Sequence, residues 1–312
     1  MTIQQLEYVV AVHRHRSFSR AAEACCVTQP TLSMQIRKLE AELGVTLFDR
    51  SRKPVRATPV GEAIIRQASA NLQGLSRIRE LVEEQSTVVR GAVRLGIIPT
   101  LAPYLLPRFV TAFLRDYPEV ELIVEELLSE EIVRKLKQNL LDVGILVTPL
   151  DDGDVTEIPL FYEPFVAYVS TSHPLIHQDF IELKDLNMEE MVLLREGHCF
   201  RNQVVRICPE LPRKGPAPHL RFESGSLETL KRIIETNYGY TLLPELAVID
   251  LPAEKRHYLK ELTQPKPVRE VSLAVHRGFP KRRLVEALRE AIHEGIPEYL
   301  RDDRGGRIVP WV

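Results

Sequence analysis

The chain lacks the long apolar segments and the cysteine spacings that mark membrane proteins and disulfide scaffolds. No apolar run approaches the roughly 18 residues that a bilayer-spanning helix needs, and no basic segment precedes an apolar stretch near residue 1. Only 4 of the 312 residues are cysteine, and none has the CxxC spacing. This length provides about two domains, which excludes a small disulfide scaffold. We expect a cytoplasmic protein without membrane contact, whose cysteines are free thiols, metal ligands or a switch.

Internal repeats, low-complexity segments and a strong net charge are absent as well. Apolar residues make up 44% and charged residues 27% of the chain, which is typical of a globular protein. The net charge of −2 is unevenly distributed, because residues 1–60 contain nine Lys and Arg against five Asp and Glu. A basic segment attached to an acidic body indicates a DNA-binding module, since phosphate attraction supplies most non-specific affinity. The alternative is an ordinary solvated face.

Residues 1–60 have the pattern of short helices followed by a wing. The segment SFSRAAEA begins with serines that can cap a helix, and its alanines allow close packing. Another helix follows in PTLSMQIRKLEAELG, where Thr28 is the predicted cap, Pro30 suits the first turn and Gly44 can end the helix. LFDRSRKPVRATP, with four basic residues and a proline, suits a wing over the DNA backbone. We expect a winged helix-turn-helix DNA-binding domain.

The predicted recognition helix is amphipathic. Its apolar stripe consists of Leu32, Ile36, Leu39 and Leu43. The side chains off this stripe can hydrogen-bond base edges, and Arg50 in the wing is expected to contact phosphate. The predicted DNA contacts are Gln29, Pro30, Thr31, Ser33, Gln35, Arg37, Lys38 and Arg50.

A long linker helix is predicted over residues 58–89. Thr58 can cap this helix, and Pro59 suits its first turn. One apolar stripe recurs at steps of three and four residues and includes Ile64, Ala68, Leu72 and Leu75. We expect these four residues to pair with a second copy of the chain and hold dimers together. The alternative is that the stripe packs on the chain's own body.

From residue 91 onward, short strands alternate with helices. The strands AVRLGII, VELIVEEL and LDVGILV are separated by helices that begin near Leu105 and Ser129. This order predicts βαβ units and a parallel sheet, whose ligand crevices lie beyond the carboxyl ends of the strands. Pro99, Thr100 and Ser129 are therefore placed to hold a small ligand. Their alternative role is to cap helices.

Several segments resemble a known family. SFSRAAEACCVTQPTLSMQIRKLEAELGVTLFDR closely resembles the helix-turn-helix of LysR-type transcriptional regulators. LGIIPTLAPYLLP, GHCFRNQVVRIC and SLETLKRIIETNYGYTLLPELAV are similar to segments of their hydrogen-peroxide-sensing OxyR branch. The resemblance covers essentially the whole chain. It implies a tetrameric DNA-binding regulator with an α/β redox-sensing domain at 91–312, built from two periplasmic-binding-protein-like lobes. Lobe I is expected at about 91–162 and 268–300, and lobe II at about 163–267.

The resemblance also implies roles for individual residues. Cys199 matches the peroxidatic cysteine and Cys208 the resolving cysteine, which join in a disulfide after peroxide attack. The implied peroxide pocket consists of Thr100, Ser129, Gly197, His198 and Arg201. Ser129 stands where the branch commonly has threonine, Asn202 where we expect aspartate, and Lys266 where we expect an arginine near the sensor. The implied partners are double-stranded promoter DNA, hydrogen peroxide, RNA polymerase, a cellular thiol reductant and further copies of the chain.

The chemistry of such a sensor sets requirements on the cysteine loop. Peroxide oxidises a thiolate, so Cys199 needs a lowered pKa, for which Arg201 is the nearest cation in the sequence. Thr100 and Ser129 can hydrogen-bond the two peroxide oxygens from the facing lobe. His198 is expected to bind peroxide or orient the loop, and the alternative is a packed neutral histidine. If CFRNQVVRIC is helical, Cys199 and Cys208 lie on different faces, so bridging them demands rearrangement.

Other interpretations of the cysteines remain open. A thiol peroxidase would use Cys199 and Cys208 but leaves the DNA-binding segment unexplained. A metal site of His198, Cys199, Cys208 and His219 fits no common zinc spacing, so we expect no metal or cofactor and no enzyme. A sister regulator that binds a small organic inducer between its lobes shares everything except the cysteine chemistry. Cys25 and Cys26 are expected to be structural free thiols in the helix-turn-helix.

Overall fold

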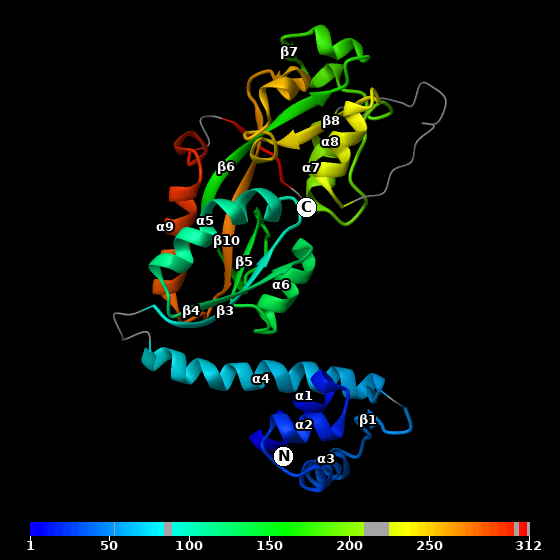
Figure 1. Ribbon diagram of the computed structural model, residues 1–312, viewed down its shortest axis with the longest axis vertical. Helices are drawn as coiled ribbons and strands as arrows, with labels where there is room; N and C mark the ends of the chain where they lie inside the picture. Colours follow the sequence, from blue (N-terminus) through cyan, green and yellow to red (C-terminus); the bar gives the residue numbers. More distant parts are fainter. Residues whose placement is uncertain (53, 84–88, 209–224, 303–305, 311–312) are drawn as a thin grey trace. The chain divides into compact units, whose positions relative to one another are not determined.

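The computed structural model describes residues 1–52, 54–83, 89–208, 225–302 and 306–310, which belong to two compact units (Figure 1). The first unit holds helices α1 to α4 and a two-stranded sheet, and the second holds the elements from β3 to β11. Within these described ranges, no helix combines the length and the hydrophobicity that crossing a membrane requires.

The first unit is a winged helix-turn-helix, as predicted. It contains α1 (Ile3–His15), α2 (Phe18–Ala24), α3 (Gln29–Leu43), α4 (Pro59–Glu83) and a wing of antiparallel β1 (Phe48–Asp49) and β2 (Arg56–Ala57). The side chains of Ser17, Thr28 and Thr58 accept backbone N–H groups at the starts of α2, α3 and α4. Gly44 ends α3 with a left-handed φ of 68°, which a glycine adopts without strain. The caps predicted from the sequence are confirmed.

The apolar stripes of α3 and of the first half of α4 pack in the core of this unit. Leu32, Ile36 and Leu39 are fully buried, whereas Leu43, the last residue of α3, is 38% exposed. Along α4, Ala68 is 2% exposed in the single chain, because the amino-terminal half of this helix packs against α1. Ile64 also packs partly on the core of this unit. The prediction that Ala68 faces a second copy is therefore wrong.

Lobe I of the second unit has the predicted βαβ order. It contains β3 (Gly91–Ile97), α5 (Ala102–Asp116), β4 (Val120–Glu126), α6 (Ser129–Lys137), β5 (Val143–Thr148) and, later in the chain, α9 (Arg282–Gly295) with a 3-10 turn at Glu298–Leu300. Strand β3 lies between β4 and β5 and is parallel to both. The loops after β3 and β4 therefore reach the same edge of the sheet and bring Thr100 and Ser129 there.

Lobe II is built around antiparallel strands and two helices. It contains β7 (Phe180–Ile181), α7 (Cys199–Ile207), α8 (Leu227–Glu235), β8 (Tyr240–Pro244), β9 (Leu259–Leu262) and 3-10 turns at Pro174–His177, Leu183–Asp185, Glu245–Ala247 and Ala253–Tyr258. Strands β8 and β9 pair with β6 (Val155–Val169). A short strand near the carboxyl terminus, β11 (Arg307–Ile308), runs parallel to the start of β10 (Pro267–His276).

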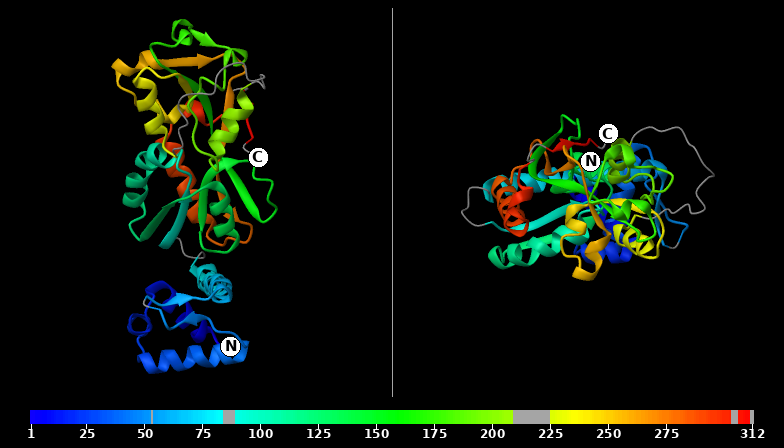
Figure 2. Two further views of the ribbon diagram at one scale, coloured as in Figure 1. Left: turned by 90° about the vertical axis from the view of Figure 1, so that its right-hand side faces the viewer. Right: turned by 90° about the horizontal axis from the view of Figure 1, so that it is seen from above.

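Two long strands connect the lobes. β6 and β10 are antiparallel neighbours and pass from one lobe to the other (Figures 1 and 2). The hydrophobic core changes along β6, because Phe161 packs in the core of lobe I and Phe165 in that of lobe II. Helix α7 meets both cores, since Cys199 packs with the first and Cys208 with the second. The two cysteines thus pack in the cores of different lobes.

Candidate functional site

Helix α7 separates the two cysteines that the sequence singles out. His198 is its N-cap residue, Cys199 is its first residue and Cys208 is its C-cap. Both thiols are free and each cysteine is 5% exposed. Nine residues of helix span about 13 Å, whereas a disulfide requires Cα atoms within about 7 Å. The cysteines lie in different cores, as expected for a helical segment, so a bridge between them requires α7 to unwind.

The cation beside Cys199 is Arg269, which the sequence analysis missed. Arg269 lies on β10, is fully buried, and its guanidinium stands 5.4 Å from the centre of the Phe200 ring. It faces Glu163 directly across the β6–β10 ladder. Oε2 of Glu163 accepts from Nε of Arg269 at 2.8 Å and lies 2.7 Å from Nη2, and Oε1 accepts from the Leu246 N–H at 2.7 Å. Arg269 thus brings a guanidinium near Cys199, and Glu163 offsets part of its positive charge.

Arg269 also sets the orientation of the Thr100 hydroxyl. Nη1 of Arg269 donates to Oγ1 of Thr100 at 3.0 Å, and Nη2 donates to the Thr100 carbonyl oxygen at 3.3 Å. Because a guanidinium has donors only, the Thr100 hydroxyl accepts in this contact and keeps its own hydrogen for another acceptor. Thr100 is 1% exposed, so that hydrogen lies in the protein interior.

Ser129 supplies a second hydroxyl beside the thiol. This 4% exposed hydroxyl has no hydrogen-bond partner in the part of the chain that the structure describes. A buried hydroxyl without a partner is a group that a small polar ligand can satisfy. The expectation that Thr100 and Ser129 approach Cys199 from lobe I agrees with this geometry.

The two thiols differ in electrostatic environment. Burial raises the pKa of Cys199, while the Ser129 hydroxyl, the charge of Arg269 and the Phe200 N–H oppose that shift. Burial alone raises the pKa of Cys208 to about 12, with no group opposing it. The expected low pKa of Cys199 is therefore not reached in this conformation, but only Cys199 has groups that stabilise its thiolate.

Two basic residues predicted near the sensor lie elsewhere. Nη1 of Arg201 donates to the Leu194 carbonyl oxygen at 3.1 Å, and its Nη2 lies 3.9 Å from Glu196. Arg201 follows Cys199 by two residues, and a helix directs such side chains to different faces. Lys266, expected to replace an arginine near the sensor, pairs instead with Glu261 at 2.8 Å. The charge that acts on Cys199 is that of Arg269.

His198 faces a different cavity from Cys199. It is 3% exposed and lines a cavity of about 390 Å³ with residues of both lobes, among them Pro99, Tyr104, Arg195 and Gly225. Nε of Arg195 lies 3.4 Å from Nε2 of His198 and donates to it. Burial, and then the charge of Arg195, lowers the pKa of His198. The imidazole is therefore neutral with its proton on Nδ1, which matches the packed alternative better than direct contact with peroxide.

Two glycines shape this segment. Gly197 has a φ of 91°, a left-handed conformation that glycine adopts without strain, and it turns the chain into α7. A Cβ atom at Gly225 would approach Nε2 of His198 to 2.9 Å, so this glycine leaves room for the imidazole. Gly197 was predicted as a pocket residue, and it contributes through its backbone conformation.

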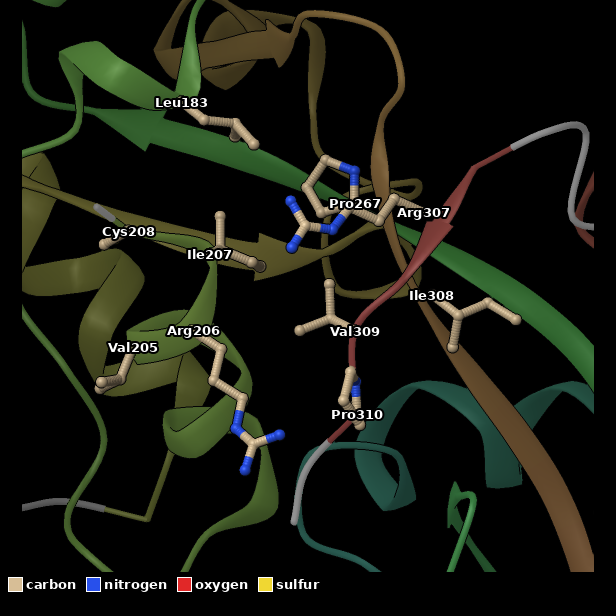
Figure 3. Close-up of a pocket in the computed structure, with 10 residues that line it drawn as sticks. All are labelled: Leu183, Val205, Arg206, Ile207, Cys208, Pro267, Arg307, Ile308, Val309 and Pro310. Carbon is tan, nitrogen blue, oxygen red and sulfur yellow. The ribbon is translucent and has the colours of Figure 1, made fainter. Parts of the chain in front are cut away.

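The carboxyl-terminal segment contacts α7 on the Cys208 side. Nε2 of Gln203, a fully buried residue of α7, donates to the Val309 carbonyl oxygen at 2.6 Å. Val309 is 5% exposed and packs in the core of lobe II. A cavity of about 450 Å³ lies beside Cys208 and is lined by residues 205–208 of α7 and 307–310 of the terminal segment (Figure 3). No local pattern in the sequence links the two segments, so this contact was not predicted.

The predicted DNA-contacting residues are distributed over the exposed side of α3. Gln29, Pro30, Thr31, Arg37 and Lys38 are exposed, whereas Ser33 and Gln35 are half-buried. Oε1 of Gln35 accepts from Nε2 of Gln5 at 3.3 Å. Met34, 60% exposed on the same helix, was not predicted, and an apolar side chain there can contact a thymine methyl group.

Arg50 is held within the first unit. Its Nη2 pairs with Glu40 at 2.9 Å, its Nη1 donates to Ser33 at 3.0 Å, and its guanidinium lies 4.8 Å from the centre of the Phe18 ring. In this structure, which contains no DNA, Arg50 connects the wing to α2 and α3, and its phosphate contact stays a prediction. Ser33 accepts from Arg50 and retains its own hydroxyl hydrogen for a base.

The residues that remain are the later part of the α4 stripe, the two cysteines of the first unit and His219. On α4, Leu72 is half-buried and Leu75 is 39% exposed, so the later part of the stripe has apolar surface to offer. Cys25 and Cys26 are free thiols at the turn after α2. Within the described ranges, no three His, Cys, Asp or Glu side chains cluster as metal ligands, and His219 lies outside those ranges.

The chain matches two family models. Residues 3–62 match the model described as bacterial regulatory helix-turn-helix protein, lysR family. Residues 86–297 match the LysR substrate binding domain. The two matches cover both compact units.

Known relatives and solved structures agree with the two family matches. The chain is 37% identical to the DNA-binding transcriptional dual regulator OxyR of Escherichia coli strain K12, over 94% of this chain and 95% of that protein. It is similar to full-length OxyR from Pseudomonas aeruginosa with a cysteine-to-aspartate substitution, with a TM-score of 0.76, 37% identity and coverage of 94% and 98%. It is also similar to a cysteine mutant of Corynebacterium glutamicum OxyR with hydrogen peroxide bound, with a TM-score of 0.59, 26% identity and coverage of 94% of each chain.

Proposed function

The chain belongs to the LysR family of bacterial helix-turn-helix regulators, and we propose that it is a peroxide-sensing transcription factor of the OxyR type. The observation that carries this proposal is the buried Cys199, which lies beside Arg269 and two hydroxyls, Thr100 and Ser129, that have hydrogens to donate. A regulator that binds a bulky inducer has no need of such a pocket around a thiol. The peroxide-bound relative from Corynebacterium supports the same ligand.

The pocket supplies the groups that peroxide chemistry requires. The Cys199 thiolate attacks one peroxide oxygen, the O–O bond breaks, and the second oxygen leaves as hydroxide and is protonated to water. The hydroxyls of Thr100 and Ser129 donate to the peroxide, and the nearby charge of Arg269 stabilises the leaving oxygen as it becomes negative. His198, through its contact with Arg195, orients the turn before α7. Arg201, which bonds Leu194, is assigned no direct role.

The sulfenic acid then forms a disulfide with Cys208. The Cys208 sulfur, once deprotonated, attacks the Cys199 sulfur, a S–S bond forms and the hydroxyl leaves as water. This step requires α7 to unwind, because its helical length holds the sulfur atoms apart. Unwinding removes Cys208 from the core of lobe II and changes the packing between the lobes. The disulfide therefore converts a redox event into a change of conformation.

We assign the regions of the chain to the parts of such a regulator. Residues 1–60 bind promoter DNA, 58–89 form the linker that joins two copies, and 91–312 sense peroxide. Lobe I comprises about 91–162 and 268–300, and lobe II about 163–267. The assembly is a homodimer or homotetramer in the cytoplasm, RNA polymerase is its partner at the promoter, and a cellular thiol reductant restores the dithiol.

Single-cysteine variants test this proposal. Cys199→Ser removes the attacking thiolate, so the protein is expected to keep its reduced conformation and DNA footprint in micromolar peroxide. Cys208→Ser keeps the attack but leaves a sulfenic acid, which dimedone labels and mass spectrometry detects. Dimedone on Cys208 in the first variant, with none on Cys199 in the second, would reverse the assigned roles. The organic-inducer alternative predicts no peroxide-dependent mass change on either cysteine.

A further inference from the structure

We propose that Glu163 is a positioning residue for the sensor: its carboxylate holds the Arg269 guanidinium against Thr100 and limits how strongly that charge acts on Cys199. This inference rests on the proposed function for its importance, although its test requires no peroxide. Neither the sequence pattern nor the resemblance singled out Glu163. It is fully buried and lies on β6, far from Cys199 in the chain.

The strand register determines which donors of Arg269 are available. Glu163 stands opposite Arg269 on the neighbouring antiparallel strand. Its Oε2 atom lies 2.8 Å from Nε and 2.7 Å from Nη2, so this edge of the guanidinium is occupied. Thr100 is contacted from Nη1 at 3.0 Å. Because the guanidinium is planar, fixing one edge on Glu163 fixes the direction of the other toward Thr100.

The hydrogen bonds around Glu163 favour its ionised form. Three N–H groups point at its two oxygens, namely Nε and Nη2 of Arg269 and the Leu246 amide. A carboxyl proton would need an acceptor, and none of these three groups can accept. Burial raises the pKa of Glu163, and the charge of Arg269 opposes that shift. The pair is therefore close to neutral as a unit, and Cys199 experiences only part of the positive charge.

Other ionisable groups pack around this pair. Lobe I contributes Tyr104 on α5, whose hydroxyl donates to Glu228 at 2.8 Å. The turn after β8 contributes Glu245, which accepts from the Tyr299 hydroxyl at 2.6 Å. The start of α7 contributes His198, which burial keeps neutral. Lys231 lies over the Tyr104 ring and Arg195 contacts His198, but the charge that acts on Cys199 is that of Arg269. Removing the opposing charge of Glu163 should therefore affect the Cys199 thiol.

The opposite effects of two substitutions separate this role from a structural one. In a full-length background with Cys25, Cys26 and Cys208 changed to serine, the Cys199 thiolate is followed by its absorbance near 240 nm against pH. Each variant is compared with its Cys199→Ser counterpart, which subtracts tyrosine ionisation. Glu163→Gln keeps the shape and hydrogen-bonding oxygen but removes the charge. It is expected to raise the thiolate fraction roughly tenfold at a fixed pH below the midpoint, since one pH unit of midpoint equals a tenfold change.

Arg269→Gln should act in the opposite direction and lower that fraction, because it removes the cation. Glu163→Asp withdraws the carboxylate from Arg269 and should give a smaller increase than Glu163→Gln, which provides a second test if the glutamine variant does not fold. Loss of thiolate in the Glu163 variants as well as in Arg269→Gln, or an unchanged profile, would overturn the proposal. Peroxide sensitivity is measured separately, so a failure of the proposed function would not be mistaken for a failure here.

Discussion

At the scale of single residues, the sensor depends on which buried groups still have a proton to donate. Arg269 occupies the acceptor side of the Thr100 hydroxyl, so Thr100 can act on peroxide only as a donor. Thr100→Val keeps the shape and removes that hydrogen. We expect oxidation of Cys199 by peroxide to slow roughly 100-fold, as when one donor is removed from an oxyanion site. The measurement is the stopped-flow rate of thiol loss. Thr236→Val, which changes an exposed threonine of lobe II, should react at the parent rate.

A second residue-scale prediction concerns Cys208 and pH. Its pKa is about 12 in the folded protein and near the ordinary value when unfolded, so the unfolded state loses this proton first. The stability that Cys208 contributes is therefore fully present below the ordinary pKa and declines as pH rises toward 12. Urea denaturation at pH 8 and pH 10 should show a smaller loss for Cys208→Ser than for the parent. Equal losses would mean that burial does not suppress this thiolate.

At the scale of elements, β11 ties the carboxyl terminus to the helix that must unwind. Removing residues 306–312 deletes the Gln203–Val309 bond and the backbone bonds from the Arg307 and Val309 N–H groups to the Lys266 and Val268 carbonyl oxygens. A hydrogen bond contributes about 1 kcal/mol, so loss of the first alone should favour the disulfide about fivefold. Titration of the thiols in glutathione redox buffers measures this shift. Ile308→Ala, which changes an exposed side chain of the strand, should leave the equilibrium at the parent value.

Two arginine variants distinguish direct contact with DNA from stabilisation of the DNA-binding unit. Arg37 is exposed, so Arg37→Ala should weaken promoter binding by about 1–3 kcal/mol, roughly 5-fold to 150-fold, and leave the melting temperature unchanged. Arg50 joins the wing to α3, so Arg50→Ala should lower both the affinity and the melting temperature. Fluorescence anisotropy with promoter DNA and thermal unfolding measure the two quantities. If Arg50→Ala reduced affinity without any loss of stability, the predicted phosphate contact would be supported.

At the scale of the whole molecule, the peroxide signal has to act through an assembly of copies. Ala68 is buried within the chain. Leu72 and Leu75 are therefore the part of the α4 stripe that can contact a second copy. Leu72→Asp places a charge in that contact, and an unpaired buried charge costs several kcal/mol. We expect sedimentation to show monomers at concentrations where the parent is assembled. Unchanged sedimentation would place the interface elsewhere.

The sequence alone determined what depends on neighbours along the chain. The caps at Ser17, Thr28 and Thr58, the left-handed Gly44 and the wing were predicted because each involves residues only a few positions apart. The alternation of strands and helices likewise predicted the parallel part of lobe I. The opposite placement of the two cysteines followed from the helical period of the nine residues that join them.

Only the tertiary structure decided which groups surround the sensor. Arg201 is near Cys199 in the sequence but bonds Leu194, whereas Arg269 reaches the sensor through the pairing of β6 with β10. Strand register and burial depend on contacts between distant segments, and no local period encodes them. For the same reason the sequence did not predict Glu163, the Gln203–Val309 bond or the contact of Arg50 with Ser33. Interactions between neighbouring residues determine the helices and their ends, whereas contacts between distant segments determine the partners of each buried charge.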